Sequence, residues 1–217
     1  MSATYQQASE TRPALEASDP ENLLLARAPR YRLSAEMLRD NALSTSGLLS
    51  QRMGGAGAKP YDLTESFKPI SHDKGEGVYR RSVYTFWKRT GPAPVMMALD
   101  ASKRDVCRAK RETTATPLQA WVLMNGPQFV EAARMLGEAM VREHGDNIQT
   151  IVRETFRTLT SREPSVRETA LLRQLHDEQL AIFEKDAISA VNPEDISVIP
   201  FSTTRFLFLK RFLLTPF

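Results

Sequence analysis

The chain has 217 residues, of which 41% are hydrophobic and 25% charged, a composition typical of a globular protein. Its 29 basic and 26 acidic residues leave a net charge of +3, an imbalance too small to favour nucleic-acid binding. Cys107 is the single cysteine, which excludes an internal disulfide framework, a four-cysteine zinc site and the C-x-x-C-H attachment of a c-type haem. We therefore expect no cofactor and no metal in this chain.

Neither end of the chain has the pattern of a targeting or membrane-spanning segment. Residues 1–7 have neither a basic start nor an apolar run, so they predict no signal peptide. The most apolar stretch, residues 206–214, is about half as long as a spanning helix and carries Lys210 and Arg211 in its middle. We expect no membrane span.

The N-terminal third predicts one clear helix. Residues 1–32 are polar and interrupted by prolines, which indicates an extended segment with at most a short helix over residues 21–27. Ser34 is typical of an N-cap and begins a predicted helix over residues 34–52. We place the end of that helix at Gly54, because glycine is favoured just past a helix C-terminus.

A small β element is predicted after a long loop. The glycine-rich residues 54–77 are typical of a surface loop. Residues 78–87 are dense in β-branched and aromatic side chains, and a Gly-Pro turn separates them from residues 95–99. These two segments predict a pair of short strands.

Helix signals dominate the next part of the chain. Thr116 followed by Pro117 is typical of a helix start, and Ser165 with Glu168 has the spacing of a capping box, as has Asp146 with Gln149. The predicted helices are 117–124, 127–144, 147–160 and 166–186. The sequence thus predicts a mainly α-helical domain with a small two-stranded β element.

Several segments, in a fixed order, carry a family resemblance. They are residues 19–27 (DPENLLLAR), 29–36 (PRYRLSAE), 79–90 (YRRSVYTFWKRT), 99–102 (LDAS), 116–120 (TPLQA) and 127–133 (PQFVEAA). This set resembles the C-terminal domain of unknown function, numbered fifteen fifty-three, of large planctomycete proteins that carry cytochrome-c-like modules. The family brings no catalytic set that can be carried over to this chain.

The resemblance implies more than the residues themselves do. It implies an extracytoplasmic location and a role linked to redox or complex-glycan metabolism. In the relatives, haem is held in separate modules. In the family, a helical stretch and a further domain precede the segment similar to residues 2–7, so the chain resembles a fragment whose partners include those upstream segments. Residues 1–186 are thus expected to form a partial domain, and residues 187–217 an atypical tail, frameshifted or disordered.

A basic and aromatic region is the candidate binding surface. Nine basic and four acidic residues fall between Glu76 and Glu112, a local excess of five positive charges. Aromatic rings suit stacking on a sugar, and arginines hold carboxylate or sulfate groups through paired hydrogen bonds. The simpler alternative is a solvated face whose arginines pair within the fold. The candidate residues are Arg80, Arg81, Tyr84, Trp87, Asp100, Cys107, Arg108 and Arg111.

The sequence leaves two classes of function open. The leading hypothesis is a non-catalytic binding or interaction module with a glycan or a redox protein as partner. The alternative is an enzyme that acts on polysaccharide or a redox-linked substrate through Asp100 and neighbouring arginines. Basic neighbours would favour a reactive thiolate at Cys107, but no histidine pair accompanies it, so a buried structural cysteine is the simpler interpretation. An enzyme should gather these groups around one pocket, whereas a module should show them dispersed or paired.

Overall fold

The computed structural model describes residues 3, 6–9, 12–28, 31–62, 71–88, 92–103, 107 and 109–185. The chain divides into two units between Leu33 and Ser34, and each unit is described by itself. Helices dominate the described residues, and the predicted mainly α-helical fold is confirmed. The predicted tail, residues 187–217, lies outside the described residues.

The first unit contains one short helix, α1 (Pro13–Ser18). The short helix expected over residues 21–27 is absent; these residues form a compact loop instead. The physical reason lies in Asp19, whose carboxylate accepts hydrogen bonds from the backbone amides of Leu23 at 2.9 Å and Leu24 at 2.8 Å. A side chain that binds nearby amides in this way offers the backbone an alternative to a helix.

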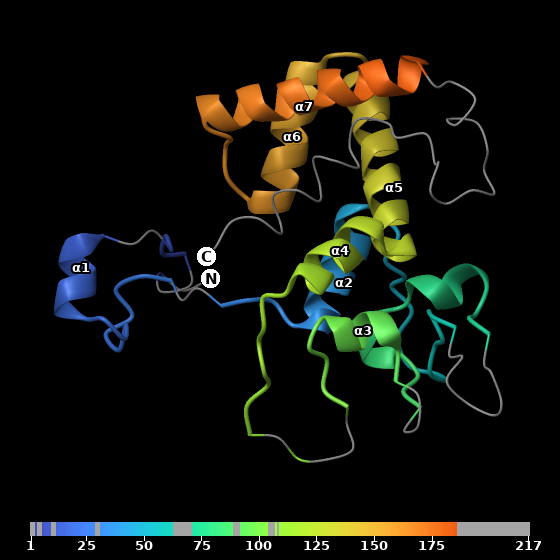
Figure 1. Ribbon diagram of the computed structural model, residues 1–217. Coiled ribbons are helices and arrows are strands. Elements are labelled where there is room, and N and C mark those ends of the chain that lie inside the picture. Colours follow the sequence, from blue (N-terminus) through green and yellow to red (C-terminus); the bar gives the residue numbers. More distant parts are fainter. Residues whose placement is uncertain are drawn as a thin grey trace. The chain divides into compact units, whose positions relative to one another are not determined.

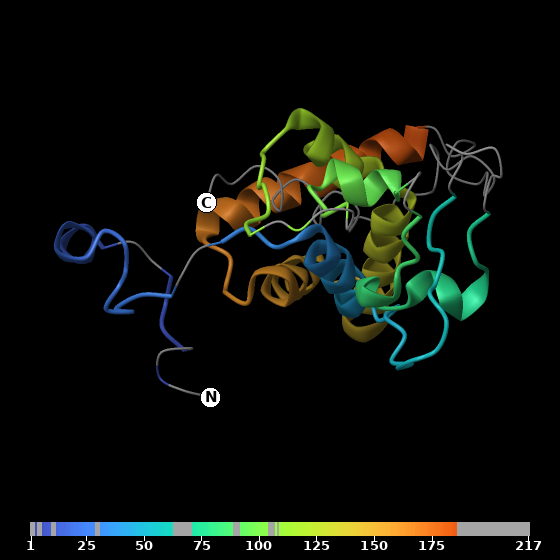
Figure 2. The same cartoon turned by 90° about the horizontal axis from the view of Figure 1, so that it is seen from below.

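The second unit is built around α5 (Pro127–His144), which packs against α2 (Ala35–Thr45) and α6 (Ile148–Thr160). The last described helix, α7 (Val166–Lys185), packs on α6 (Figure 1, Figure 2). The buried faces of α2, α5 and α6 are mainly apolar. The core includes Leu43, Val130, Leu136, Ile151, Val152 and Phe156.

Two shorter helices complete this unit: α3 (Pro94–Ala98) and α4 (Pro117–Asn125). Each begins with a proline, a position where the missing backbone N–H has no helical partner to lose. Helix α4 contacts both α3 and α5 and so connects α3 to the longer helices. None of the described helices is long and apolar enough to cross a membrane.

Capping side chains fix the starts of three helices as the sequence predicts. The Ser34 hydroxyl accepts from the amide three residues later at the start of α2. Thr116 and Gln119 exchange both bonds of a capping box at the start of α4. Ser165 and Glu168 do the same before α7. These bonds satisfy amides that the first helical turn leaves without a partner.

The end of α2 differs from the prediction, because the helix stops at Thr45 and does not reach residue 52. Gly47 adopts φ +74°, and its amide donates to the Ser44 carbonyl at 3.2 Å. The amide of Leu48 donates to the Leu43 carbonyl at 2.9 Å. This pair of bonds is the Schellman motif. The motif requires one residue in a left-handed conformation, which glycine adopts at little cost because it has no Cβ.

The predicted two-stranded β element is not found among the described residues. The predicted strand over residues 78–87 lies in a region with two short 3-10 helices, η1 (Gly75–Tyr79) and η2 (Ser82–Tyr84). The predicted strand over residues 95–99 is also wrong, because the helix α3 covers nearly all of it. An isolated parallel bridge joins Ala58 to Thr85 instead. The backbone after η2 pairs with the chain some 27 positions earlier, and sequence patterns do not report so distant a partner.

Two hydrogen bonds join Lys59 to Asp73, shortly before η1. The amide of Asp73 donates to the Lys59 carbonyl at 2.8 Å, and the amide of Lys59 donates to the Asp73 carboxylate, also at 2.8 Å. The chain therefore returns to the same place after fourteen residues.

Candidate functional site

A buried arginine on α2 organises the region of the candidate residues. Arg39 is only 1% exposed. Its guanidinium donates to the carbonyl oxygens of Val78 at 2.6 Å and Arg80 at 2.7 Å, and to the Ser82 hydroxyl at 3.2 Å. Its Nε donates to Oε1 of Gln128 on α5 at 2.7 Å. One side chain thus ties the η1–η2 segment to two helices.

The neighbouring carboxylate completes this cluster. Asp40 accepts from the Ser82 amide at 2.8 Å and lies 3.6 Å from the Arg39 guanidinium. A buried cation needs both a counter-charge and filled hydrogen bonds, and Arg39 has both. The sequence did not reveal this role, because a lone arginine on a helix is more often solvated. The only signal available was its place between the apolar Leu38 and Ala42.

Arg80, one of the candidate binding residues, is buried and structural. It is 6% exposed, and its guanidinium donates to the Ala56 carbonyl at 2.6 Å and to the Gly54 carbonyl. The same group stacks 4.1 Å from the centre of the Tyr84 ring. The Tyr84 hydroxyl in turn accepts from the Gly54 amide at 2.8 Å. Arg80 and Tyr84 therefore hold the glycine-rich residues 54–57 in place.

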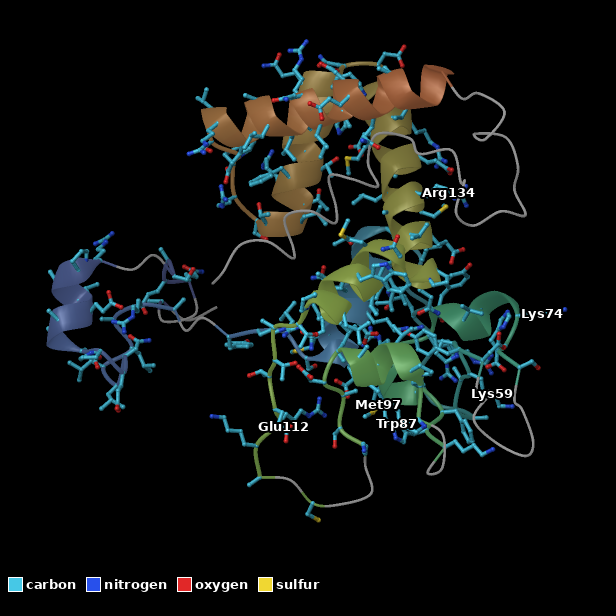
Figure 3. All side chains as sticks on the ribbon, in the orientation of Figure 1. Lys59, Lys74, Trp87, Met97, Glu112 and Arg134 are labelled. Carbon is cyan, nitrogen blue, oxygen red and sulfur yellow. The ribbon has the colours of Figure 1, made fainter. Side chains whose placement is uncertain are left out.

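The segments that meet at Ala58 and Thr85 carry exposed apolar side chains, the exposed Arg52 and the half-buried Lys59 and Arg81. Met53, Val83 and Phe86 are 68%, 70% and 36% exposed. Arg81, also a candidate, reaches Gln51 over 3.1 Å. Figure 3 shows Lys59 and Trp87 in this loop region and Arg134 on α5. We name this set the glycine-loop surface; its members are Arg52, Met53, Lys59, Arg81, Val83 and Phe86.

Asp100 is fixed by neighbours in its own fold. It adopts φ +63°, an uncommon left-handed conformation for a residue other than glycine. Its carboxylate accepts from the Thr114 amide at 2.7 Å, from the Thr114 hydroxyl at 2.9 Å and from the Gln119 amide group at 2.9 Å. These bonds close the segment between α3 and α4. Asp100 is thus a structural acceptor in this arrangement.

Arg111 pairs with a carboxylate on α2. Its guanidinium lies 2.8 Å from the Glu36 carboxylate. Partial burial raises the pKa of Glu36, but hydrogen bonds from its own backbone amide and from Arg111 outweigh that effect and leave the pKa below its usual value. The pair joins the α3–α4 segment to α2.

The other candidate residues are not brought into one site. Cys107 is exposed, so its interpretation as a buried structural cysteine is wrong. Trp87 is half-buried, and Arg108 lies outside the described residues. No group of three metal-ligating side chains occurs in the part of the chain that the structure describes. A small hollow between α6 and α7, lined by Ile148, Val152 and Arg173 among others, contains no candidate residue.

A tyrosine outside the candidate set has a perturbed hydroxyl. Tyr79 donates to the Glu131 carboxylate at 2.6 Å. This hydrogen bond, with partial burial and the negative charge of Glu131, raises the pKa of Tyr79 to about 12. Burial also raises the pKa of Tyr61. Both shifts favour neutral phenols, which suits packing and hydrogen bonding rather than proton transfer near neutral pH.

These observations define a small helical domain in which Arg80, Asp100 and Arg111 are each bound to other groups of the fold. The model of the family PSD1, a protein of unknown function (DUF1553), matches residues 1–176, and the chain belongs to this family. No curated protein and no solved structure matches the chain. The resemblance to the domain numbered fifteen fifty-three is thereby confirmed. The planctomycete and cytochrome-c associations that it implied remain expectations.

Proposed function

We propose that this domain is a binding module that recognises an acidic polysaccharide through the glycine-loop surface. The observation that carries the proposal is the fixed backbone beneath this surface. Arg80 and Tyr84 bind the backbone of residues 54 and 56, and Ala58 exchanges backbone hydrogen bonds with Tyr84 at 2.7 Å and Phe86 at 2.6 Å. Exposed side chains on a fixed backbone bind with a smaller loss of conformational entropy than side chains on a mobile loop.

The chemistry of the surface suits a sugar that carries carboxylate or sulfate groups. Arg52 and Arg81 offer planar groups of donors, which bind such anions through paired hydrogen bonds. Phe86 offers an aromatic face, with the Lys59 ammonium 6.0 Å from its ring centre. A sugar ring stacked on Phe86 would place its acidic substituents within reach of these cations.

Binding is favoured over catalysis by the partners of the polar candidates. Asp100 accepts hydrogen bonds from Thr114 and Gln119, and Arg111 forms an ion pair with Glu36. A carboxylate so occupied would have to give up hydrogen bonds before it could act as a general base. We place the module in an extracytoplasmic assembly, with upstream segments of a larger family protein as further partners.

Titration calorimetry of the full chain tests the proposal. The probes are polygalacturonate and dextran sulfate, with neutral dextran as the reference. The Arg81→Ala/Phe86→Ala variant should bind the acidic polymers about tenfold more weakly, because it loses one charge-assisted contact and one stacking face. Binding should also weaken as salt rises.

A matched control uses an exposed basic and apolar pair on another element. Arg142→Ala/Val141→Ala removes the same two kinds of side chain from the end of α5 and should bind as the native chain does. The proposal fails if the native chain binds neither acidic polymer, or if both double variants lose affinity equally. Cleavage of either polymer by the native chain would favour the enzyme alternative.

A further inference from the structure

Three consecutive leucines of the first unit lie at the surface. Leu23, Leu24 and Leu25 are 76%, 82% and 52% exposed. Single exposed leucines are ordinary, but three in succession form a continuous apolar patch. Leu25 also adopts φ +52°, which bulky side chains rarely do. We name residues 23–25 the leucine tip.

The polar groups beneath the leucine tip are satisfied from within. Besides the two amides bound by Asp19, the Leu25 amide donates to the Asn22 carbonyl at 3.2 Å. All three leucine amides therefore have partners. Asp19 itself is only 8% exposed although it carries a charge.

Two further side chains brace the same loop. The Asn22 side chain accepts from the Arg27 amide at 3.2 Å and donates to the Arg27 carbonyl at 2.7 Å. The Arg27 guanidinium donates to the Asp19 carbonyl at 2.9 Å and the Pro20 carbonyl at 2.7 Å. The loop is thus held by its polar residues while its apolar residues point outward.

Such an arrangement suits an apolar surrounding. Amides without partners are costly to remove from water, whereas amides that are already bonded are not. The leucine tip can therefore leave water without exposing its own N–H groups to a medium that cannot bind them. Lipid chains can also rearrange around adjacent leucine side chains that protrude together.

The sequence that follows the leucine tip is basic and aromatic. Arg30 and Arg32 flank Tyr31 in the sequence, and no acidic residue lies between Pro29 and Ala35. Tyr31 is 69% exposed. Tyrosine favours the boundary between water and lipid, and arginines close to a membrane surface are attracted to anionic headgroups.

We propose that the leucine tip inserts into the surface of a lipid bilayer that contains anionic lipids, with the segment around Tyr31 at the headgroups. The protein would lie on the membrane and would not span it. This inference concerns the first unit and is independent of the glycine-loop surface.

Co-sedimentation of the full chain with vesicles tests the proposal. The vesicles are phosphatidylcholine alone, and phosphatidylcholine with phosphatidylglycerol. We expect salt-sensitive binding that is stronger to the mixed vesicles. The Leu23→Ser/Leu24→Ser variant should partition about tenfold or more weaker, because two leucine side chains no longer leave water.

The control removes two exposed leucines from a different element. Leu171 and Leu180 of α7 are 56% and 47% exposed, and Leu171→Ser/Leu180→Ser should leave vesicle binding unchanged. A second measurement places an environment-sensitive dye at position 24 through Leu24→Cys, with Cys107→Ser to remove the native thiol. Its emission should shift to the blue with mixed vesicles.

Several results would overturn the proposal. One is a native chain that binds neither vesicle; another is equal loss in the two double serine variants. A dye at position 24 that stays in water while the protein is vesicle-bound would show that another surface makes the contact. If Leu23→Ser/Leu24→Ser instead abolishes self-association of lipid-free protein that binds no vesicle, the leucine tip is a protein interface.

Discussion

The Nε of Arg39 and the Oε1 of Gln128 lie 2.7 Å apart, although 89 positions separate the two residues. Arg39 also binds two carbonyls of the η1–η2 segment. We expect Arg39→Met to lower the free energy of unfolding by about 3 kcal/mol or more, because it leaves buried acceptors unpaired. Urea unfolding followed by circular dichroism measures this change.

The matched control for that experiment is Arg142→Met, which removes an exposed arginine from α5. It should change the free energy of unfolding by less than about 0.5 kcal/mol, as surface substitutions usually do. Equal effects of the two variants would mean that Arg39 contributes only its general charge.

The Schellman motif at the end of α2 gives a second prediction. Gly47→Ala places a Cβ on a residue with φ +74°, where nothing else lies within 4 Å. We expect a loss of about 1 kcal/mol, the cost of a left-handed conformation for alanine. Ser44→Ala, on the exposed side of the same helix, is the comparison, and it should not destabilise the chain. A Gly47→Ala variant as stable as the native chain would contradict this origin of the helix end.

The hydrogen bond between Tyr79 and Glu131 predicts an unusual titration. The raised pKa means that the folded chain holds the phenolic proton more tightly than the unfolded chain, whose tyrosines titrate near 10. Its stabilising effect is present below about pH 10 and is lost as the pH rises toward about 12. Glu131→Gln should lower the pKa of Tyr79, as followed by ultraviolet difference absorbance.

Glu138→Gln serves as the control for the tyrosine titration, since Glu138 pairs with Arg134 and does not bind Tyr79. The control should reproduce the native curve. If Glu131→Gln also leaves the curve unchanged, partial burial and not the carboxylate sets the shift.

Asp19 predicts a pH dependence of the leucine loop. Hydrogen bonds from the Leu24 and Leu23 amides, with the nearby charge of Arg27, outweigh desolvation and lower the pKa of Asp19. A lowered pKa means that the carboxylate stabilises this loop above the ordinary aspartate value near 4, and that the effect is lost as the pH falls below it. Amide chemical shifts of Leu23 and Leu24 should follow this titration.

Asp19→Ala should remove the acid-dependent change in those two amide shifts, whereas Glu16→Ala on α1 should preserve it. Persistence of the titration in Asp19→Ala would assign it to another group.

Local signals predicted the helix starts well, because a cap involves only residues three positions apart. Ser34, Thr116 and Ser165 all act as the sequence indicates. The expected cap of α6 was displaced by one residue, since Asn147 and not Asp146 accepts from the Thr150 amide. Adjacent residues of similar chemistry compete for this role, and their order alone does not decide between them.

The candidate site was predicted less well, because its geometry depends on distant contacts. The density of aromatic and β-branched residues at 78–87 resembles a strand, yet the segment is held by Arg39 from α2. The charge of Arg80 suggests a ligand-binding residue, but in the structure its guanidinium binds the carbonyls of residues 54 and 56. The charge pattern of a sequence shows which charged groups are present, but it does not show which of them are already bound within the fold.

The reciprocal tie between Lys59 and Asp73 has a consequence for chain length. Because the tie holds Lys59 and Asp73 together, the entropy of closing the chain between them depends only weakly on the number of residues in between. That cost grows by only about 0.6 kcal/mol for each doubling of length. We therefore expect relatives to vary in length between positions 62 and 71 while the helices keep their spacing. A ten-residue glycine-serine insertion there should leave thermal unfolding nearly unchanged, and the same insertion between Gly47 and Leu48 should not be tolerated.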